Sequence, residues 1–254
     1  MTSLLLRTFP NPEAIGQAAA QTCLQLAKEA IANHGQFTIA LSGGSTPKRL
    51  FQILAEAPFV GQMNWSKTHV FWGDERSVPP DHADSNYKMA NDALLAKISI
   101  PQENVHRMEA EREDRDAAAQ EYQQKIANVF GATPSGPPPA FDLILLGMGP
   151  DGHTASLFPG TEALGVTNKW VTPNFVPQKD THRTTFTYPL INAAKQVLFL
   201  IAGADKADRL FEVWTGPTDA QRLPSQRIGP SAGTLAWYVD QAAIAKLTAG
   251  LQSS

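Results

Sequence analysis

The sequence of 254 residues contains only one cysteine, Cys23, which excludes an intramolecular disulfide. Such sparse cysteine usage fits a reducing compartment, and the first ten residues, MTSLLLRTFP, lack the charged start and long apolar core of a signal peptide. No apolar run approaches the roughly 18 residues that a membrane helix needs. We therefore expect a cytoplasmic protein with no membrane partner, in which Cys23 packs inside a helix.

Positive charge is also scarce in this sequence. Lys and Arg number 21 against 24 Asp and Glu, so the net charge is −3, and no basic run is present. Nucleic acid is therefore not an expected partner. An anionic ligand would have to meet locally concentrated positive charge, because the overall field would not attract it. Neither HxH nor HExxH occurs, so metal binding is the weaker alternative and no metal is expected.

Apolar strand patterns alternate with helical patterns along the chain. Strands are expected at FTIAL (37–41), HVFW (69–72), FDLILL (141–146), TTFTYP (184–189) and QVLFLIAG (196–203). Helices are expected at 13–33, 47–56, 85–98, 112–131, 205–214 and, at the C-terminus, 235–247. Strands that are apolar throughout and alternate with helices predict an α/β fold, with a mostly parallel sheet covered by helices on both faces.

The only linker-like stretch is ATPSGPPPA, residues 132–140, with four prolines in nine residues. It could separate two domains or form a stiff surface loop. Similar strand patterns flank it on both sides, which favours the loop. We therefore expect one domain over residues 1–254.

Four of the expected strands are followed by polar, glycine-containing segments, namely SGGSTP (42–47), GDER (73–76), GMGPDGH (147–153) and GADK (203–206). Ligands of parallel sheets bind beyond the carboxyl ends of the strands, so these segments could meet in one crevice. In SGGSTP, glycines permit close approach, and the start of the next helix, capped by Ser45 or Thr46, offers free amides for a phosphate. A tight turn with a helix cap is the alternative for this segment.

The segment GMGPDGH carries the most chemical information. Asp151 and His153 are two residues apart, so their side chains can point the same way in an extended turn. A carboxylate beside an imidazole fixes its tautomer and raises its basicity. A histidine that only hydrogen-bonds the turn remains the alternative.

Three further cations follow strands or precede them. Arg76 in GDER offers a rigid fork for a phosphate or carboxylate, or else forms a surface ion pair with Asp74 or Glu75. Lys206 in GADK and Arg183, just before TTFTYP, could reach the same crevice or could simply be solvated.

Together, LSGGSTPKRLF, VFWGDERSVPPDHADSNYKMA, FDLILLGMGPDGHTASLFPG and FLIAGADKA resemble the 6-phosphogluconolactonase family, which is related to the glucosamine-6-phosphate deaminases and isomerases. The resemblance extends from about Thr8 to Leu247. It implies a Rossmann-like α/β fold, no cofactor, and hydrolysis of the sugar phosphate 6-phosphoglucono-1,5-lactone to 6-phosphogluconate in the pentose phosphate pathway.

The resemblance also assigns residues. It makes His153 the catalytic histidine, Asp151 its neighbouring acid and Arg76 the arginine of the DER motif. The substrate-binding residues that it implies are Ser42, Gly43, Gly44, Ser45, Thr46, Arg183 and Lys206, and we add Asp74 beside Arg76. Our hypothesis is that His153 acts as the base toward water and that Arg76 or backbone amides stabilise the oxyanion.

A deaminase or isomerase is the nearest rival, and there Asp74 would be the acid for carbon-bound proton transfer. Relatives in that branch tend to carry tyrosine in place of Arg76 and an Ile-Ala-Phe-Asn-like run in place of TASLFPG, so both segments favour the lactonase. A non-catalytic sugar-phosphate sensor would keep the cations but would not need His153.

Overall fold

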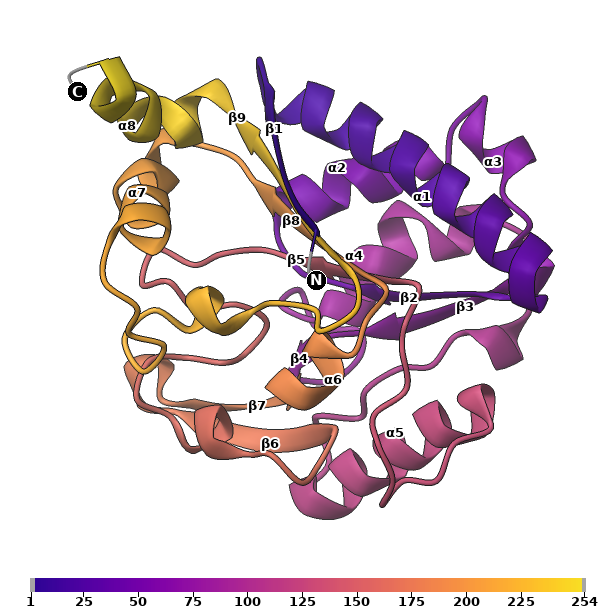
Figure 1. Cartoon of the computed structure of the whole chain (residues 1–254). Helices are drawn as coiled ribbons and strands as arrows, with labels where there is room; N and C mark the ends of the chain where they lie inside the picture. Colours follow the sequence, from indigo (N-terminus) through magenta and orange to yellow (C-terminus); the bar gives the residue numbers. More distant parts are fainter. Residues whose placement is uncertain (1–2, 253–254) are drawn as a thin grey trace.

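The computed structural model of the chain describes the backbone of residues 3–252 and the side chains of residues 3–247. Its main layer is a six-stranded sheet in the order β1-β9-β8-β5-β2-β3, in which every neighbouring pair is parallel (Figure 1). The strands are β1 (Ser3–Phe9), β2 (Phe37–Leu41), β3 (Thr68–Trp72), β5 (Leu143–Leu146), β8 (Gln196–Ile201) and β9 (Thr234–Asp240).

Helices cover both faces of this sheet, as the sequence predicts. One face packs against α1 (Pro12–His34), α2 (Ser45–Leu54), α3 (Phe59–Gln62) and α4 (Asn86–Ala93). The other packs against α5 (Arg115–Phe130), α6 (Tyr188–Asn192), α7 (Ala207–Thr215) and α8 (Gln241–Gln252).

The apolar strands supply both cores because their side chains alternate between the two faces. In β8, Leu198 and Leu200 pack with α1 and α2, whereas Val197, Phe199 and Ile201 pack with the helices of the opposite face. Burial on both sides explains why these strands are apolar throughout.

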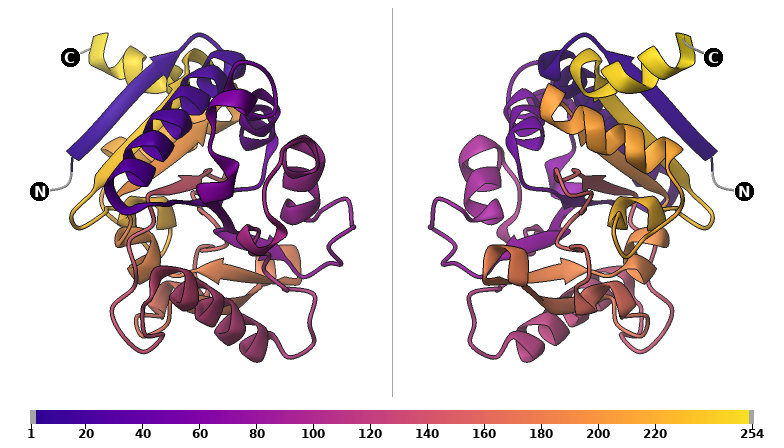
Figure 2. Two further views of the ribbon diagram at one scale, coloured as in Figure 1. Left: turned by 90° about the vertical axis from the view of Figure 1, so that its right-hand side faces the viewer. Right: turned by 90° about the vertical axis from the view of Figure 1, so that its left-hand side faces the viewer.

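A smaller antiparallel sheet lies beside the main one, in the order β4-β7-β6 (Figure 2). It consists of β4 (Asp74–Arg76), β6 (Val171–Val176) and β7 (Thr181–Phe186), and β6 packs against α5. The segment TTFTYP therefore belongs partly to β7 and not to the parallel sheet. The reason is local, since the short turn 177–180 joins β6 to β7 as a hairpin.

The C-terminal segment corrects another prediction. Residues 234–240 form β9 between β1 and β8, and helix α8 begins only at Gln241. The run LAWYV is buried on both faces, so its apolar content reflects a central strand and not a helix. Asp240 then marks the helix start, where its Oδ1 accepts a hydrogen bond from the amide of Ala243 at 2.8 Å.

Several helix boundaries also differ from those expected, and α5 and α7 begin at Arg115 and Ala207 instead of residues 112 and 205. Helix α2 begins at Ser45, not at Pro47, and Gly44 is its N-cap, so the expected caps Ser45 and Thr46 are wrong. Gly44 has φ of 108°, a conformation that glycine adopts without strain, and it turns the chain directly from the loop into the helix. Helix α4 is shorter than expected and ends at Ala93, while its predicted cap Ser85 is confirmed by a hydrogen bond from Lys88.

The proline-rich stretch 132–140 connects α5 to β5. Its carbonyl groups at Pro134 and Gly136 accept hydrogen bonds from the side chains of Gln123 and Trp170. These bonds tie the stretch to α5 and to the start of β6, and they support our proposal that the chain forms one domain.

The difference between central and edge strands gives a stability prediction. Leu198→Ala removes a fully buried side chain from β8 and should lower the free energy of unfolding by about 2–5 kcal/mol. Leu5→Ala removes the same atoms from the exposed edge strand β1 and should change it by less than about 0.5 kcal/mol. Urea unfolding measures both, and equal losses would contradict this assignment of the core.

Candidate active site

A cavity of about 670 Å³ opens where β2, β3, β5 and β8 end. These four strands are neighbours in the sheet, so the segments that follow them all border the same space. Of the residues singled out from the sequence, the cavity is lined by Ser42, Gly43, Gly44, Asp74, Arg76, His153, Arg183 and Lys206. Asp151 contacts His153 from behind, and Ser45 and Thr46 form the adjoining first turn of α2.

The loop 42–46 presents the N-terminus of α2 to the cavity. No side chain of residues 3–247 caps this helix, so the amides of its first turn are available to an anion, where the helix dipole also favours negative charge. Gly43 lies against Asn86, the first residue of α4, and a Cβ atom at position 43 would be 2.1 Å from Oδ1 of Asn86. The close packing of the loop against α4 thus requires glycine here.

The pair of Asp151 and His153 has the geometry of an oriented base. Nδ1 of His153 lies 2.5 Å from Oδ1 of Asp151, and the same oxygen accepts the backbone N–H of His153 at 3.1 Å. Nε2 has no hydrogen-bond partner among residues 3–247, and the ring borders the cavity. A Cβ atom on Gly149 would be 2.0 Å from Nδ1, so the pair fits only because residue 149 lacks a side chain.

Charge and burial both act on the Asp151 carboxyl. Burial raises its pKa, but the hydrogen bond and the charge of His153 outweigh that effect, so the pKa of Asp151 lies below its usual value. The carboxyl therefore stays ionised beside the imidazole and can hold it in one tautomer.

Arg76 and Arg183 face each other across β4 and β7, as register partners in the small sheet. Neither forms an ion pair with an acid of residues 3–247, and Nε of Arg183 is buried without a hydrogen-bond partner there. Burial and the nearby charge of Arg76 lower the pKa of the Arg183 guanidinium. Asp74, Glu75 and Asp84 act on Arg183 in the opposite direction, but within residues 3–247 neither arginine forms an ion pair, so this part of the cavity favours an anion.

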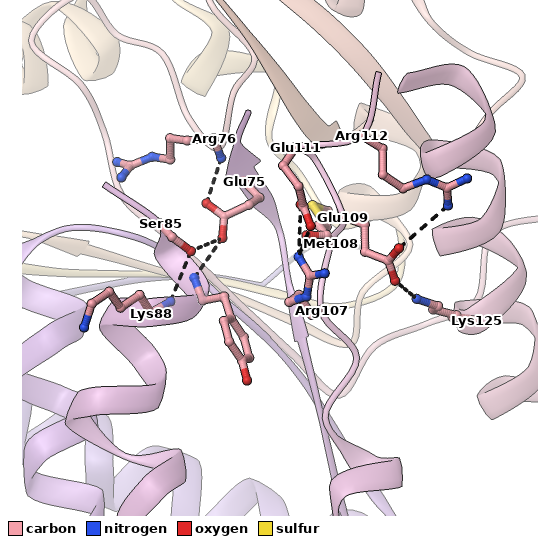
Figure 3. A network of polar contacts seen from close by, with 11 residues as sticks. Glu75, Arg76, Ser85, Lys88, Arg107, Met108, Glu109, Glu111, Arg112 and Lys125 are labelled. Atoms are coloured by element: carbon pink, nitrogen blue, oxygen red, sulfur yellow. Dashed lines mark hydrogen bonds and ion pairs between the residues drawn. The ribbon is translucent and has the colours of Figure 1, made fainter. Parts of the chain in front are cut away.

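Arg76 does not form the surface ion pair that was its alternative role. Its side chain extends away from the Glu75 carboxylate (Figure 3). Its Nη1 donates to the backbone carbonyl of Asp84 at 2.5 Å. Asp74 is buried, and its Oδ2 accepts a hydrogen bond from the hydroxyl of Ser156 at 2.7 Å.

Glu75 has a structural position. Its carboxylate accepts hydrogen bonds from the amide of Arg76 and from the hydroxyl of Ser85 (Figure 3). It also accepts hydrogen bonds from the amides of Asn86 and Tyr87. It therefore joins β4 to the N-terminus of α4. Burial raises the pKa of Glu75, and the negative charge of Asp74 raises it further. The backbone donors lower the pKa, but they do not outweigh burial.

Sequence reasoning missed several residues that border the cavity, among them Asn86, Ser156, Phe158 and Lys179. Lys179 ends the turn between β6 and β7 and supplies a fourth cation besides Arg76, Arg183 and Lys206. The hairpin that carries it could not be recognised while TTFTYP was assigned to the parallel sheet. The ring of Phe158 stacks on His153, although the sequence distinguishes it in no way from a core phenylalanine.

Within residues 3–252, no helix is long and apolar enough to cross a membrane. The same part of the chain contains no group of three or more His, Cys, Asp or Glu residues that could hold a metal ion.

The fold and the cavity define an α/β protein with a cation-lined site at the carboxyl edge of its parallel sheet. The family model described as glucosamine-6-phosphate isomerases/6-phosphogluconolactonase matches residues 10–237. A Nostoc protein named 6-phosphogluconolactonase is 44% identical over 244 residues, covering 96% of this chain and 98% of its own. One of the same name from Synechocystis is 49% identical over 216 residues, covering 85% and 86%.

Solved structures agree with these relatives. The crystal structure of a protein called devB has a TM-score of 0.86 at 38% identity and covers 96% of this chain and 99% of its own. The 6-phosphogluconolactonase of Trypanosoma brucei has a TM-score of 0.85 at 26% identity and covers 97% and 100%. The chain therefore belongs to the family of glucosamine-6-phosphate isomerases and 6-phosphogluconolactonases.

The packing of Gly43 against Asn86 leads to a binding prediction. Gly43→Ala should displace the loop 42–46 from its amide-presenting position and weaken binding of 6-phosphogluconate by roughly 10- to 150-fold, the worth of one charge-assisted hydrogen bond. Gly165→Ala is the matched control, because a Cβ atom there meets nothing within 4 Å. Titration calorimetry measures both affinities, and equal values would show that the loop tolerates the methyl group.

The raised pKa of Glu75 predicts how stability depends on pH. The native state binds a proton at Glu75 more readily than the unfolded state does, so the contribution of Glu75 to stability falls as pH rises from the ordinary glutamate pKa of 4.5 through the raised native pKa. The free energy of unfolding of the wild type minus that of Glu75→Gln should therefore decrease with pH over this window.

Asp92 provides a control. Its hydrogen bond to Lys88 lowers the pKa of Asp92, so the stability that this group contributes is lost only below its ordinary pKa of 3.8, and the difference between the wild type and Asp92→Asn should stay nearly flat above pH 4. Urea unfolding between pH 4 and pH 8 gives both differences. A wild-type advantage over Glu75→Gln that grows with pH would contradict the prediction.

Proposed function

We propose that this protein hydrolyses 6-phosphoglucono-1,5-lactone to 6-phosphogluconate, as a hydrolase of the pentose phosphate pathway, with His153 as the general base. The relatives from Nostoc and Synechocystis named 6-phosphogluconolactonase support the activity. The observation that supports the role of His153 is its geometry, with Nδ1 fixed by Asp151 and Nε2 at the cavity without a hydrogen-bond partner among residues 3–247.

The reaction begins with a water molecule between Nε2 of His153 and the lactone carbonyl. Nε2 takes a proton from the water as its oxygen bonds to the carbonyl carbon. Negative charge then develops on the carbonyl oxygen, and the guanidinium of Arg76 stabilises it without needing to reorganise, because Asp84 already orients that side chain.

Collapse of this tetrahedral intermediate breaks the bond between the carbonyl carbon and the ring oxygen. The proton held by His153 passes to that oxygen, directly or through a water molecule, and the product carboxylic acid then ionises. The enzyme returns to its starting state, and no covalent intermediate is formed.

The phosphate group of the substrate binds apart from Arg76, at the remaining positively charged groups of the cavity. We assign it to the loop 42–46 with Lys206 and Arg183. The amides at the start of α2 have no side-chain cap, and Nε of Arg183 lacks a partner among the described residues, so both gain hydrogen bonds when an anion arrives. Lys206 currently pairs with Asp205 at 3.0 Å, and a phosphate would compete for it.

We further propose that the protein acts in the cytoplasm on this small sugar phosphate, without nucleic acid or a membrane as partner and without a cofactor. Its single thiol supports a reducing compartment, and burial raises the pKa of Cys23 to about 12, which keeps that thiol unreactive.

A titration at constant pH tests the activity directly. The protein is added to freshly prepared 6-phosphogluconolactone, and the base needed to neutralise the released acid is recorded against spontaneous hydrolysis. A parallel reaction with glucosamine 6-phosphate, followed by ammonia release, tests the rival activity. A rate with the lactone that does not exceed the background would refute the proposal, and ammonia release alone would establish the rival.

Replacement of the base provides the matching prediction. His153→Ala should lower the catalysed rate by about 10²–10⁴-fold, the usual worth of a general base, while the affinity for 6-phosphogluconate stays nearly unchanged. Asp151→Asn should lose less, because Asp151 orients the imidazole and does not itself transfer the proton. A His153→Ala variant that retains a third of the wild-type rate would exclude His153 as the base.

A further inference from the structure

The imidazole of His153 lies flat on the ring of Phe158. Their ring centroids are 3.9 Å apart and their planes differ by 18°. Phe158 is 4% exposed and borders the cavity, five residues after His153 in the same segment. Asp151 holds Nδ1 of His153, and a Cβ atom added to Gly149 would be only 2.0 Å from that nitrogen, so the imidazole has little room to turn away from Phe158.

The positive charge that lines the cavity opposes protonation of a base located there. Four cations border it, Arg76 on β4, Arg183 on β7, Lys179 on the turn before β7 and Lys206 before α7, and they serve the anionic substrate. The acids of the lining are Asp74, which Ser156 engages, and Asp84, and Asp151 stands behind His153. Excess positive charge disfavours a protonated imidazole, the form that the proposed reaction requires as an intermediate.

A second carboxylate beside His153 would stabilise the imidazolium, but it would also repel a phosphorylated substrate. An aromatic ring face avoids that conflict. Its quadrupole attracts a cation whose charge lies within about 6 Å of the ring centre, yet the ring has no net charge. The stacking distance of 3.9 Å places the whole imidazole within that range.

We propose that Phe158 is a positioning residue that stabilises the imidazolium of His153 by a cation–π contact and so favours proton transfer from water. This inference rests on the proposed role of His153 in lactone hydrolysis. Because the imidazolium exists only after the proton has moved, the contact stabilises the transition state more than the ground state, which raises kcat and leaves substrate binding alone.

The test compares Phe158→Leu, which keeps an apolar side chain but loses the ring, with Phe158→Tyr, which keeps the ring. Phe158→Leu should lower kcat by roughly 3- to 30-fold, the range of a cation–π contact, with KM unchanged. The acid limb of the kcat/KM profile should move to lower pH by roughly 0.5 to 1.5 units, because the imidazolium then forms less readily. Phe158→Tyr should restore most of the rate and the position of the limb.

Phe71→Leu is the control, since Phe71 stacks on His106 at 4.3 Å in a similar pair that does not border the cavity. It should leave the acid limb in place, whatever its effect on stability. A loss of kcat in Phe158→Leu with the limb unmoved, or an equal shift in Phe71→Leu, would overturn the proposal and leave Phe158 a packing residue.

An NMR titration of His153 separates this inference from the activity itself. The His153 ring resonance, identified by its absence in His153→Ala, should titrate at lower pH in Phe158→Leu than in the wild type, whether or not the lactone is the substrate. Equal midpoints would overturn the stabilising contact even if lactone hydrolysis is measured. Absent lactonase activity with shifted midpoints would refute only the proposed function.

Discussion

One buried carboxylate, that of Glu75, connects the parts of the site that come from different elements. It accepts hydrogen bonds from β4 and from the first turn of α4. Once α4 is held there, Asn86 can lie against Gly43 and donate to the backbone carbonyl of Asp74 at 2.9 Å. Because its donors come from both elements, Glu75 fixes the loop 42–46 and the strand that carries Arg76 relative to each other.

The electrostatics of the cavity follow from that arrangement. The chain carries a net charge of −3, yet four cations border one space, and the two arginines among them have no ion-pair partner within residues 3–247. Like charges held close together destabilise the free protein, and the register pair of Arg76 and Arg183 is such a contact. An anionic ligand relieves this repulsion. The free energy that the two arginines cost the unliganded protein is therefore recovered as affinity when a phosphorylated substrate binds.

Sequence patterns predicted the parallel sheet, both helical layers and the convergence of the segments after β2, β3, β5 and β8, because alternation of buried strands and helices is a strong local signal. They predicted the wrong element, or none, where contacts between distant segments determine whether a segment forms a strand. The run LAWYV was assigned to a helix although β1 and β8 bury it as a strand, and β1 itself, with Leu4 and Leu5 exposed, was not foreseen. Lys179 borders the cavity because the β6–β7 hairpin carries it there, and Phe158 is part of the site because its ring stacks on His153. No local sequence pattern predicted either arrangement. The roles of the site residues stay predictions.

The fold by itself does not select the reaction. A structure described as a monomeric glucosamine-6-phosphate deaminase shares this architecture with a TM-score of 0.78 at 18% identity, which establishes likeness of fold alone. The chemistry must then reside in the groups around one imidazole. Here they are an ionised carboxylate at Nδ1, an aromatic ring on one face and guanidinium groups across the cavity. That set fits the roles that we propose, in which His153 takes a proton from water and Arg76 stabilises the oxyanion that lactone hydrolysis forms.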